Sequence, residues 1–300
     1  MANETNNDEL EGNNLARYVD LLGLIIAIIG VVLNFCSFHT AGYLKQRNSS
    51  ITLIKCLAVW DSIAIFHDGV VNLGGSYFNF IPVNFNRFNC KIFFWHSWGS
   101  TVAAIYHMNA LAIDRCLAIG APIWFKQYSK PKLAYKVSFG IAFTAYSVVA
   151  INLYLFDIVD GVCQFAANPT LVYWYLRIML FGTSSSVPFI GICVCNIFFV
   201  YQLRNRKSDN DAERRLTIML VISSMAFMGL LAACMLCLFV LFTITPTNVK
   251  EIAYVLVVEK FAEVFAITNS SLNFVFYFVS GPMFRNAFIR MVKDIFCSKQ

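Results

Sequence analysis

The sequence has few charged residues. Asp, Glu, Lys and Arg make up 13% of its 300 residues, whereas a soluble domain usually carries about 25%. Hydrophobic residues make up 58% of the chain, which indicates a membrane protein. The net charge of +6 comes from short basic clusters between apolar segments. It therefore indicates membrane topology, and we expect no nucleic-acid partner.

The motifs of enzymes and metal sites are also missing from the sequence. There is no paired Cys-x-x-Cys or Cys/His spacing, no glycine-rich phosphate loop and no Ser/His/Asp set. We expect neither enzymatic activity nor a cofactor. Nothing resembles a removable signal peptide, so the first apolar segment should act as its own targeting signal. Internal repeats, which are typical of transporters, are not apparent, and a polytopic transporter is the weaker alternative.

Seven long apolar segments fill most of the chain. Each exceeds the roughly 20 residues that a membrane-spanning helix needs. The segments are residues 18–44, 51–76, 90–119, 133–156, 171–203, 216–243 and 252–280. They predict an all-α membrane protein, a seven-transmembrane helix bundle over residues 18–281. Residues 1–17 are polar and rich in Asn, which predicts a disordered N-terminus. Residues 282–300 predict a short amphipathic helix in contact with membrane lipids, followed by a tail.

The distribution of Lys and Arg predicts the topology. Most of them lie in alternate connections and in the C-terminal tail, so the positive-inside rule places the N-terminus outside and the tail in the cytoplasm. We expect a multi-pass protein of the plasma membrane. The sequon at Asn3 would then be open to glycosylation. Cys297, beside the amphipathic helix, is a candidate for palmitoylation, and a free cytoplasmic thiol is the alternative.

Two cysteines, Cys90 and Cys163, lie at the outer face in this topology. The outer compartment is oxidising, so we expect a disulfide bond that fixes the loop before the fifth segment to the top of the third.

A carboxylate, Asp61, lies in the middle of the second segment. A lone charge there is costly unless it is paired, hydrated or protonated. Asn34 and Asn273 lie at similar depth in the first and seventh segments. We expect a polar cluster of all three residues; the alternative is three unrelated polar side chains.

An acid and a base, Asp114 and Arg115, stand side by side near the end of the third segment. A charge at the centre of a membrane helix costs about 2.5 to 3.5 kcal/mol, so such a pair indicates a function. The alternative is an interfacial pair that merely ends the helix, because Arg reaches the interface readily.

Asp114-Arg115-Cys116, followed by Pro122, resembles the Asp-Arg-Tyr signature of rhodopsin-like G-protein-coupled receptors. Further landmarks of that family occur in order along the chain after residue 18: Asn34, Asp61, Cys90, Pro188, and Asn273 to Tyr277. The ordered set is similar to that of invertebrate neuropeptide receptors.

The resemblance implies a mechanism. Arg115 would be held by Asp114 and by Glu213 at the start of the sixth segment. An extracellular ligand would move the sixth segment outward, release Arg115 and open a cavity for a heterotrimeric G protein. Tyr277 would swing inward toward Arg115, and Asn269 would belong to the polar core. The alternative for Glu213 is a solvated acid at a helix start.

Two departures from the family pattern concern prolines. Phe274 stands where the seventh segment usually has a proline, and Ala233 where the sixth has one. Without proline the usual cause of a sharp kink is gone from both segments, and Gly229 is the remaining source of flexibility in the sixth.

The same comparison excludes two ligand classes. Ser97 occupies the position of the aspartate in monoamine receptors, and Ile267 that of the retinal-binding lysine in opsins. Glu259 and Glu263 are one helical turn apart. With nearby polar and aromatic side chains they would receive the cationic group of a short neuropeptide. These side chains are His96, Ser97, Trp98 and Arg177.

Two alternatives stay open at this point. Glu259 could pair with Arg177 or Lys260 and hold helices together. The chain could also be a chemosensory receptor for small external molecules.

Overall fold

The computed structural model describes residues 2–44, 48–205, 211–243 and 249–297, and these are mostly helical. In the names below, α marks an α-helix and η a π-helix or 3₁₀-helix. The first four spans and their connections contain α1 (Ala2–Gly42), α2 (Ser49–Ile65), η1 (Phe66–Leu73), α3 (Gly74–Phe78), η2 (Pro82–Asn84), α4 (Arg87–Gly120), α5 (Pro122–Tyr128), α6 (Pro131–Val148), η3 (Val149–Ile151) and α7 (Asn152–Leu155). After the strands β1 (Phe156–Val159) and β2 (Val162–Phe165) come α8 (Pro169–Leu176), η4 (Arg177–Ser186), α9 (Val187–Asn205), α10 (Asp211–Thr243), α11 (Val249–Ser271), α12 (Asn273–Ser280) and α13 (Pro282–Cys297).

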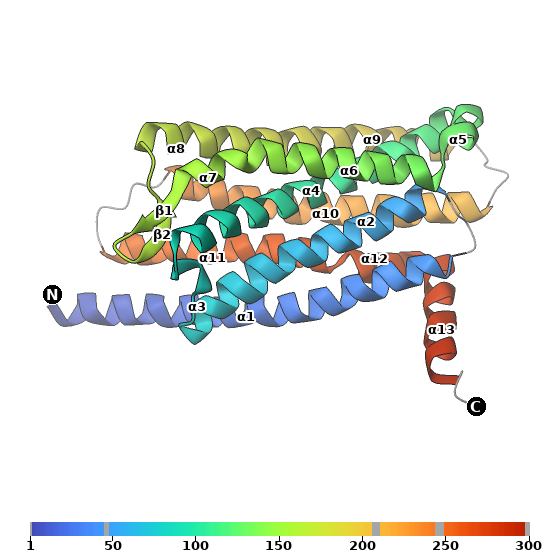
Figure 1. The fold of residues 1–300 in the computed structure, drawn as a ribbon. Helices are drawn as coiled ribbons and strands as arrows, with labels where there is room; N and C mark the ends of the chain where they lie inside the picture. The colour runs from blue at the N-terminus through green and yellow to red at the C-terminus, as the bar shows by residue number, and fades with distance from the viewer. Residues whose placement is uncertain (1, 45–47, 206–210, 244–248, 298–300) are drawn as a thin grey trace.

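The long helices run side by side along one direction (Figure 1). The N-terminus and the β1–β2 hairpin lie at one end of the bundle, which we call the hairpin end. At the opposite end, which we call the α13 end, the helix α13 runs roughly perpendicular to the long helices and extends away from the bundle.

The helices match the apolar segments of the sequence. Five are long and apolar enough to cross a membrane: Asn14–Gly42, Ser49–Phe78, Arg87–Gly120, Pro131–Leu155 and Thr217–Val240. A sixth span is the bent pair of α11 and α12, and a shorter apolar helix, Val187–Gln202, lies in the fifth segment. All seven predicted segments are therefore helical.

The helix α1 begins at Ala2 and continues into the first span, so it includes most of the polar N-terminal segment. Extending an existing helix needs no new nucleus, which makes such an extension less costly than a separate helix.

The seventh span is bent although it lacks the proline that usually causes such a kink. The axes of α11 and α12 differ by 42° across Leu272. Just before the break, the hydroxyl of Thr268 donates to the Val264 carbonyl and that of Ser271 to the Ile267 carbonyl, each at 2.7 Å. Ser and Thr side chains that bond to the preceding turn bend helices, and serine pairs mark kinks. The hydroxyls of Thr268 and Ser271 thus supply a cause of bending that needs no proline.

The segment before the fifth span contains a β-hairpin, where the sequence predicts only a loop. In the antiparallel pairing Phe156 faces Phe165 and Ile158 faces Cys163. The connection is Asp160-Gly161, and both residues have positive φ, 52° and 80°. Asp-Gly is a preferred pair for a two-residue hairpin turn because its twist matches that of the strands.

Candidate functional site

The helix α4 carries Arg115, which is 1% exposed, near the α13 end. Its Nη2 lies 2.7 Å from Oδ2 of Asp114, and its guanidinium stands 5.4 Å from the ring centre of Phe125 on α5. The other contacts of Asp114 come from the first turn of α2, where the hydroxyls of Ser49 and Ser50 donate to its two carboxylate oxygens. A buried ion pair is stable only when such additional hydrogen bonds satisfy its atoms.

Ser49, Ser50 and Phe125 were not among the residues predicted from the sequence. A signal for the serines was present, because Asn48 caps α2 by accepting from the Ile51 amide at 3.2 Å. Asn followed by an apolar run marks a helix start, and residues at a helix start face neighbouring loops and helix ends.

Two other predicted switch residues lie in α10 and α12. For Glu213 the structure describes the helical backbone but not the side chain. Tyr277 is 1% exposed and packs edge-on against Phe284, the first buried aromatic residue of α13, with ring centres 5.5 Å apart. The structure thus buries Tyr277 where α12 meets α13.

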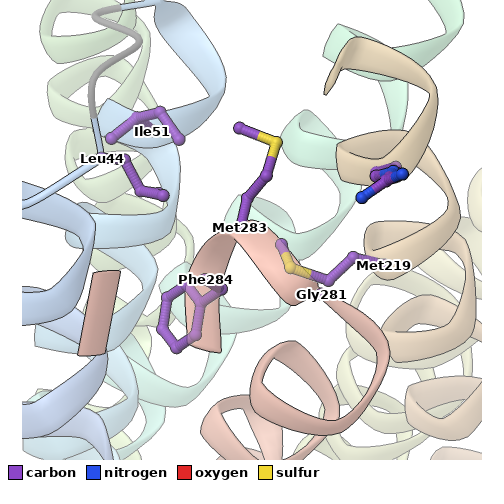
Figure 2. A pocket seen from close by; sticks show the side chains of 7 residues that line it. Leu44, Ile51, Met219, Gly281, Met283 and Phe284 are labelled. Carbon is purple, nitrogen blue, oxygen red and sulfur yellow. The ribbon is translucent and has the colours of Figure 1, made fainter. Parts of the chain in front are cut away.

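A small apolar pocket lies beside this junction (Figure 2). It is lined by Leu44, Ile51, Arg215, Met219, Gly281, Met283 and Phe284. A Cβ on Gly281 would collide with the Met219 sulfur and would stand 2.7 Å from the Tyr277 carbonyl oxygen. Glycine at this position therefore allows α10 to approach the α12–α13 junction closely.

Polar side chains at the centre of the bundle connect neighbouring helices by hydrogen bonds. Asn273 donates to Oδ2 of Asp61 at 2.8 Å, and the hydroxyl of Ser223 donates to Oδ1 of Asn273 at 3.3 Å. The Asn34 amide donates to the Ser270 carbonyl at 3.0 Å, and the Ser270 hydroxyl donates to Asp61. Asn34 is therefore linked to Asp61 through Ser270, close to the break in the seventh span.

Asn269, the remaining predicted member of the polar core, is buried one turn before Asn273.

Cys90 and Cys163 form a disulfide bond at the hairpin end, with Cα atoms 5.5 Å apart. Further contacts tie the hairpin to the start of α4. Asp157 lies 2.8 Å from Nε of Arg87 and 3.7 Å from Nζ of Lys91. The hydrogen bond from the Ile158 amide, followed by these two cations, lowers the pKa of Asp157 below its usual range.

An ionic network joins three helices at the hairpin end. Lys260 on α11 lies 3.4 Å from Asp20 on α1 and 3.5 Å from Glu263 on its own helix. Asn72 on η1 donates to Glu263 at 3.2 Å, and Ser76 on α3 donates to Asp20 at 2.7 Å. The network therefore holds the first, second and seventh spans together.

The predicted ligand residues fall into separate groups. Glu263 belongs to the ionic network, whereas Glu259, one turn away, is exposed. Ser97 donates to Asp68, and Trp98 stacks on Tyr175 at 5.8 Å.

His96 and Arg177 contact other aromatic side chains. His96 stacks on His67 at 4.6 Å between ring centres, and Arg177 lies 4.3 Å from the ring centre of Tyr173. Within the described residues, no hydrogen bond or ion pair joins His96, Trp98 or Arg177 to Glu259 or Glu263. Consecutive residues on a helix point about 100° apart, so His96, Ser97 and Trp98 cannot share one face.

For the two predicted modification sites, Asn3 and Cys297, the structure describes the backbone but not the side chains.

The arrangement defines a class of protein: a helical membrane receptor with a disulfide-bound hairpin at one end and a buried Asp-Arg pair at the other. The family model for the 7 transmembrane receptor (rhodopsin family) matches residues 30–277. The chain belongs to this family, so it is a multi-pass membrane protein and a signalling receptor. A comparison with curated proteins finds no match.

Proposed function

We propose that this receptor lies in the plasma membrane with its N-terminus outside, binds an extracellular ligand and activates a heterotrimeric G protein. The observation that carries the proposal is the burial of Arg115 at the α13 end, opposite the disulfide-bound hairpin. Buried ionisable residues in membrane helices are expensive and are retained for function.

The proposed switch is a movement of α10 away from Arg115. In the resting arrangement Arg115 is buried against Asp114 and Phe125, and the Ser49–Ser50 pair holds Asp114. Outward movement of α10 would open this end of the bundle to a G protein, and Tyr277 would turn toward Arg115. A ligand can drive the change only through a difference in its affinity for the two states.

For the ligand we propose a short neuropeptide that carries a cationic group. Acidic side chains gather around Lys260: Asp20 and Glu263 lie within 3.5 Å of its ammonium group, and Asp68 lies near Glu263. Because Lys260 and Asn72 already engage Glu263, we assign the direct ligand contact to the exposed Glu259. Charge-assisted hydrogen bonds to an Arg or Lys side chain are the strong contacts that such a carboxylate makes.

Potency tests this assignment. The variant Glu259→Gln should lower the potency of a basic, amidated peptide agonist by about tenfold, the effect of losing one charge-assisted hydrogen bond of about 1.5 kcal/mol. Asp160→Asn, which removes an exposed carboxylate at the same end, is the matched control and should leave potency unchanged. Equal potency in wild type and Glu259→Gln would remove Glu259 from the ligand site.

A further inference from the structure

Lys55 on α2 is a partly buried cation at the α13 end. Its Nζ lies 5.7 Å from the ring centre of Phe38 and 3.5 Å from the point where a Cβ on Gly42 would stand. The aromatic face attracts the ammonium group but does not neutralise it. None of the ion pairs in the described part of the chain includes Lys55.

A second cation, Arg290 of α13, lies at the same end of α1. Its Nη2 donates to the Tyr43 carbonyl at 3.2 Å, so the two cations lie near the consecutive residues Gly42 and Tyr43. His39, one turn earlier, is exposed. The negative end of the α1 dipole favours these cations, but the ion pairs of the described residues give Arg290 no carboxylate either.

The helices that carry these cations are packed together. Thr40 of α1 contacts the sulfur of Met291 in α13 at 3.9 Å, and α13 lies next to the end of α1 (Figure 1). The connection between α1 and α2, residues 45–47, has the sequence Lys-Gln-Arg and contributes no acidic side chain.

The depth of the site matches lipid headgroups. Lys55 lies six residues (55 − 49) after the start of α2 at Ser49, which is about 9 Å along a helix axis. The helix α13 runs roughly perpendicular to the long helices at this end, as a helix in the membrane interface does. Above the cations, α1 exposes an apolar stripe toward the membrane, formed by Val32, Phe35 and Phe38.

We propose that Lys55, Arg290 and His39 form a binding site for the phosphate group of an anionic lipid. The ammonium of Lys55 and the forked guanidinium of Arg290 supply donors to phosphate oxygens, and the acyl chains lie on the apolar stripe of α1. Basic pockets between spanning helices on the cytoplasmic side are the sites at which anionic headgroups bind. A lipid bound here joins α1, α2 and α13.

Binding of a fluorescent phosphatidylinositol 4,5-bisphosphate to the purified full-length receptor in phosphatidylcholine nanodiscs tests the site. One basic residue near a membrane surface contributes enough for Lys55→Gln to weaken the apparent affinity about fivefold. Arg290→Gln, which changes an exposed residue, should act in the same direction. Lys293→Gln removes the same charge from an exposed position of α13 and should leave the affinity unchanged.

Three outcomes overturn the proposal. Unchanged affinity in both Lys55→Gln and Arg290→Gln shows that the cations do not hold the lipid. An equal loss in Lys293→Gln shows diffuse attraction to the surface rather than a site. Competition by soluble inositol 1,4,5-trisphosphate at the same concentration as the lipid shows that the site takes a free phosphate and not a membrane lipid.

Discussion

Removing the ammonium group of Lys260 should destabilise the receptor measurably. Lys260 lies 3.4 Å from Asp20 and 3.5 Å from Glu263. In Lys260→Gln these carboxylates would keep only hydrogen bonds from Ser76 and Asn72 and would repel each other without a cation between them.

The size of the effect follows from burial. Breaking a buried ion pair by removing one partner costs about 3 to 5 kcal/mol. The side chain of Lys260 is 20% exposed and that of Asp20 3%, so solvent reduces the cost, and we expect about 2 kcal/mol. At roughly 2 to 4 °C per kcal/mol for large domains, the Tm should fall by about 4 to 8 °C.

Thermal unfolding of the purified receptor, with Lys293→Gln as a control of equal charge change, measures this effect. Asp20→Asn alone should be milder, because Lys260 keeps Glu263 as its partner. In the double variant the two effects should be less than additive by about 1 kcal/mol, as for residues in one network. A Tm of Lys260→Gln equal to that of the control, or strict additivity, would refute the reasoning.

Three further predictions concern the hairpin, the bend and the α10 contact. Because the folded-state pKa of Asp157 lies below its unfolded value, the stabilisation of the hairpin by Asp157 is present above about pH 4 and is lost as pH falls through the folded pKa. The mobility of a spin label on the hairpin should therefore rise on acidification, and Asp157→Asn should abolish that pH dependence. Ser271→Ala removes one hydroxyl bond to the preceding turn and should reduce the 42° bend, measured by distances between spin labels at the two ends of the seventh span. Gly281→Ala places a methyl group against Met219 and should push α10 outward, raising ligand-independent second-messenger output several-fold at equal surface expression.

For each of these three predictions, one outcome would contradict the reasoning. A pH response that persists in Asp157→Asn would assign it to another group, and unchanged spin-label distances in Ser271→Ala would remove the hydroxyl as a cause of the bend. Basal output in Gly281→Ala at or below the wild-type value would show that the close α10 contact does not hold the resting state.

The spans could be predicted from sequence because their signal is local. A run of about 20 apolar residues identifies a spanning helix without knowledge of its neighbours, and the Asp114–Arg115 pair is adjacent in the chain. The bend at Leu272 could not be predicted from the missing proline alone, since serine hydroxyls bend a helix by a different bond.

Contacts between distant segments were harder to predict. The sequence placed Asn34, Asp61 and Asn273 at similar depth but could not show that Asn34 would bond to a backbone carbonyl of the bent helix. Glu259 and Glu263 share a face of α11, yet only Glu263 is bonded by Lys260 and Asn72, and Glu259 is exposed. Which glutamate meets a partner depends on how neighbouring helices are rotated about their axes, and the sequence does not give that rotation.

The most direct test of the central claim is second-messenger output, both cAMP and calcium, in cells that express the receptor and are exposed to amidated neuropeptides, with Arg115→Ala at matched surface expression. The account predicts a saturable response to one peptide class in the wild type and its loss in Arg115→Ala. An undiminished response in Arg115→Ala would contradict the assignment of Arg115 as the switch to the G protein.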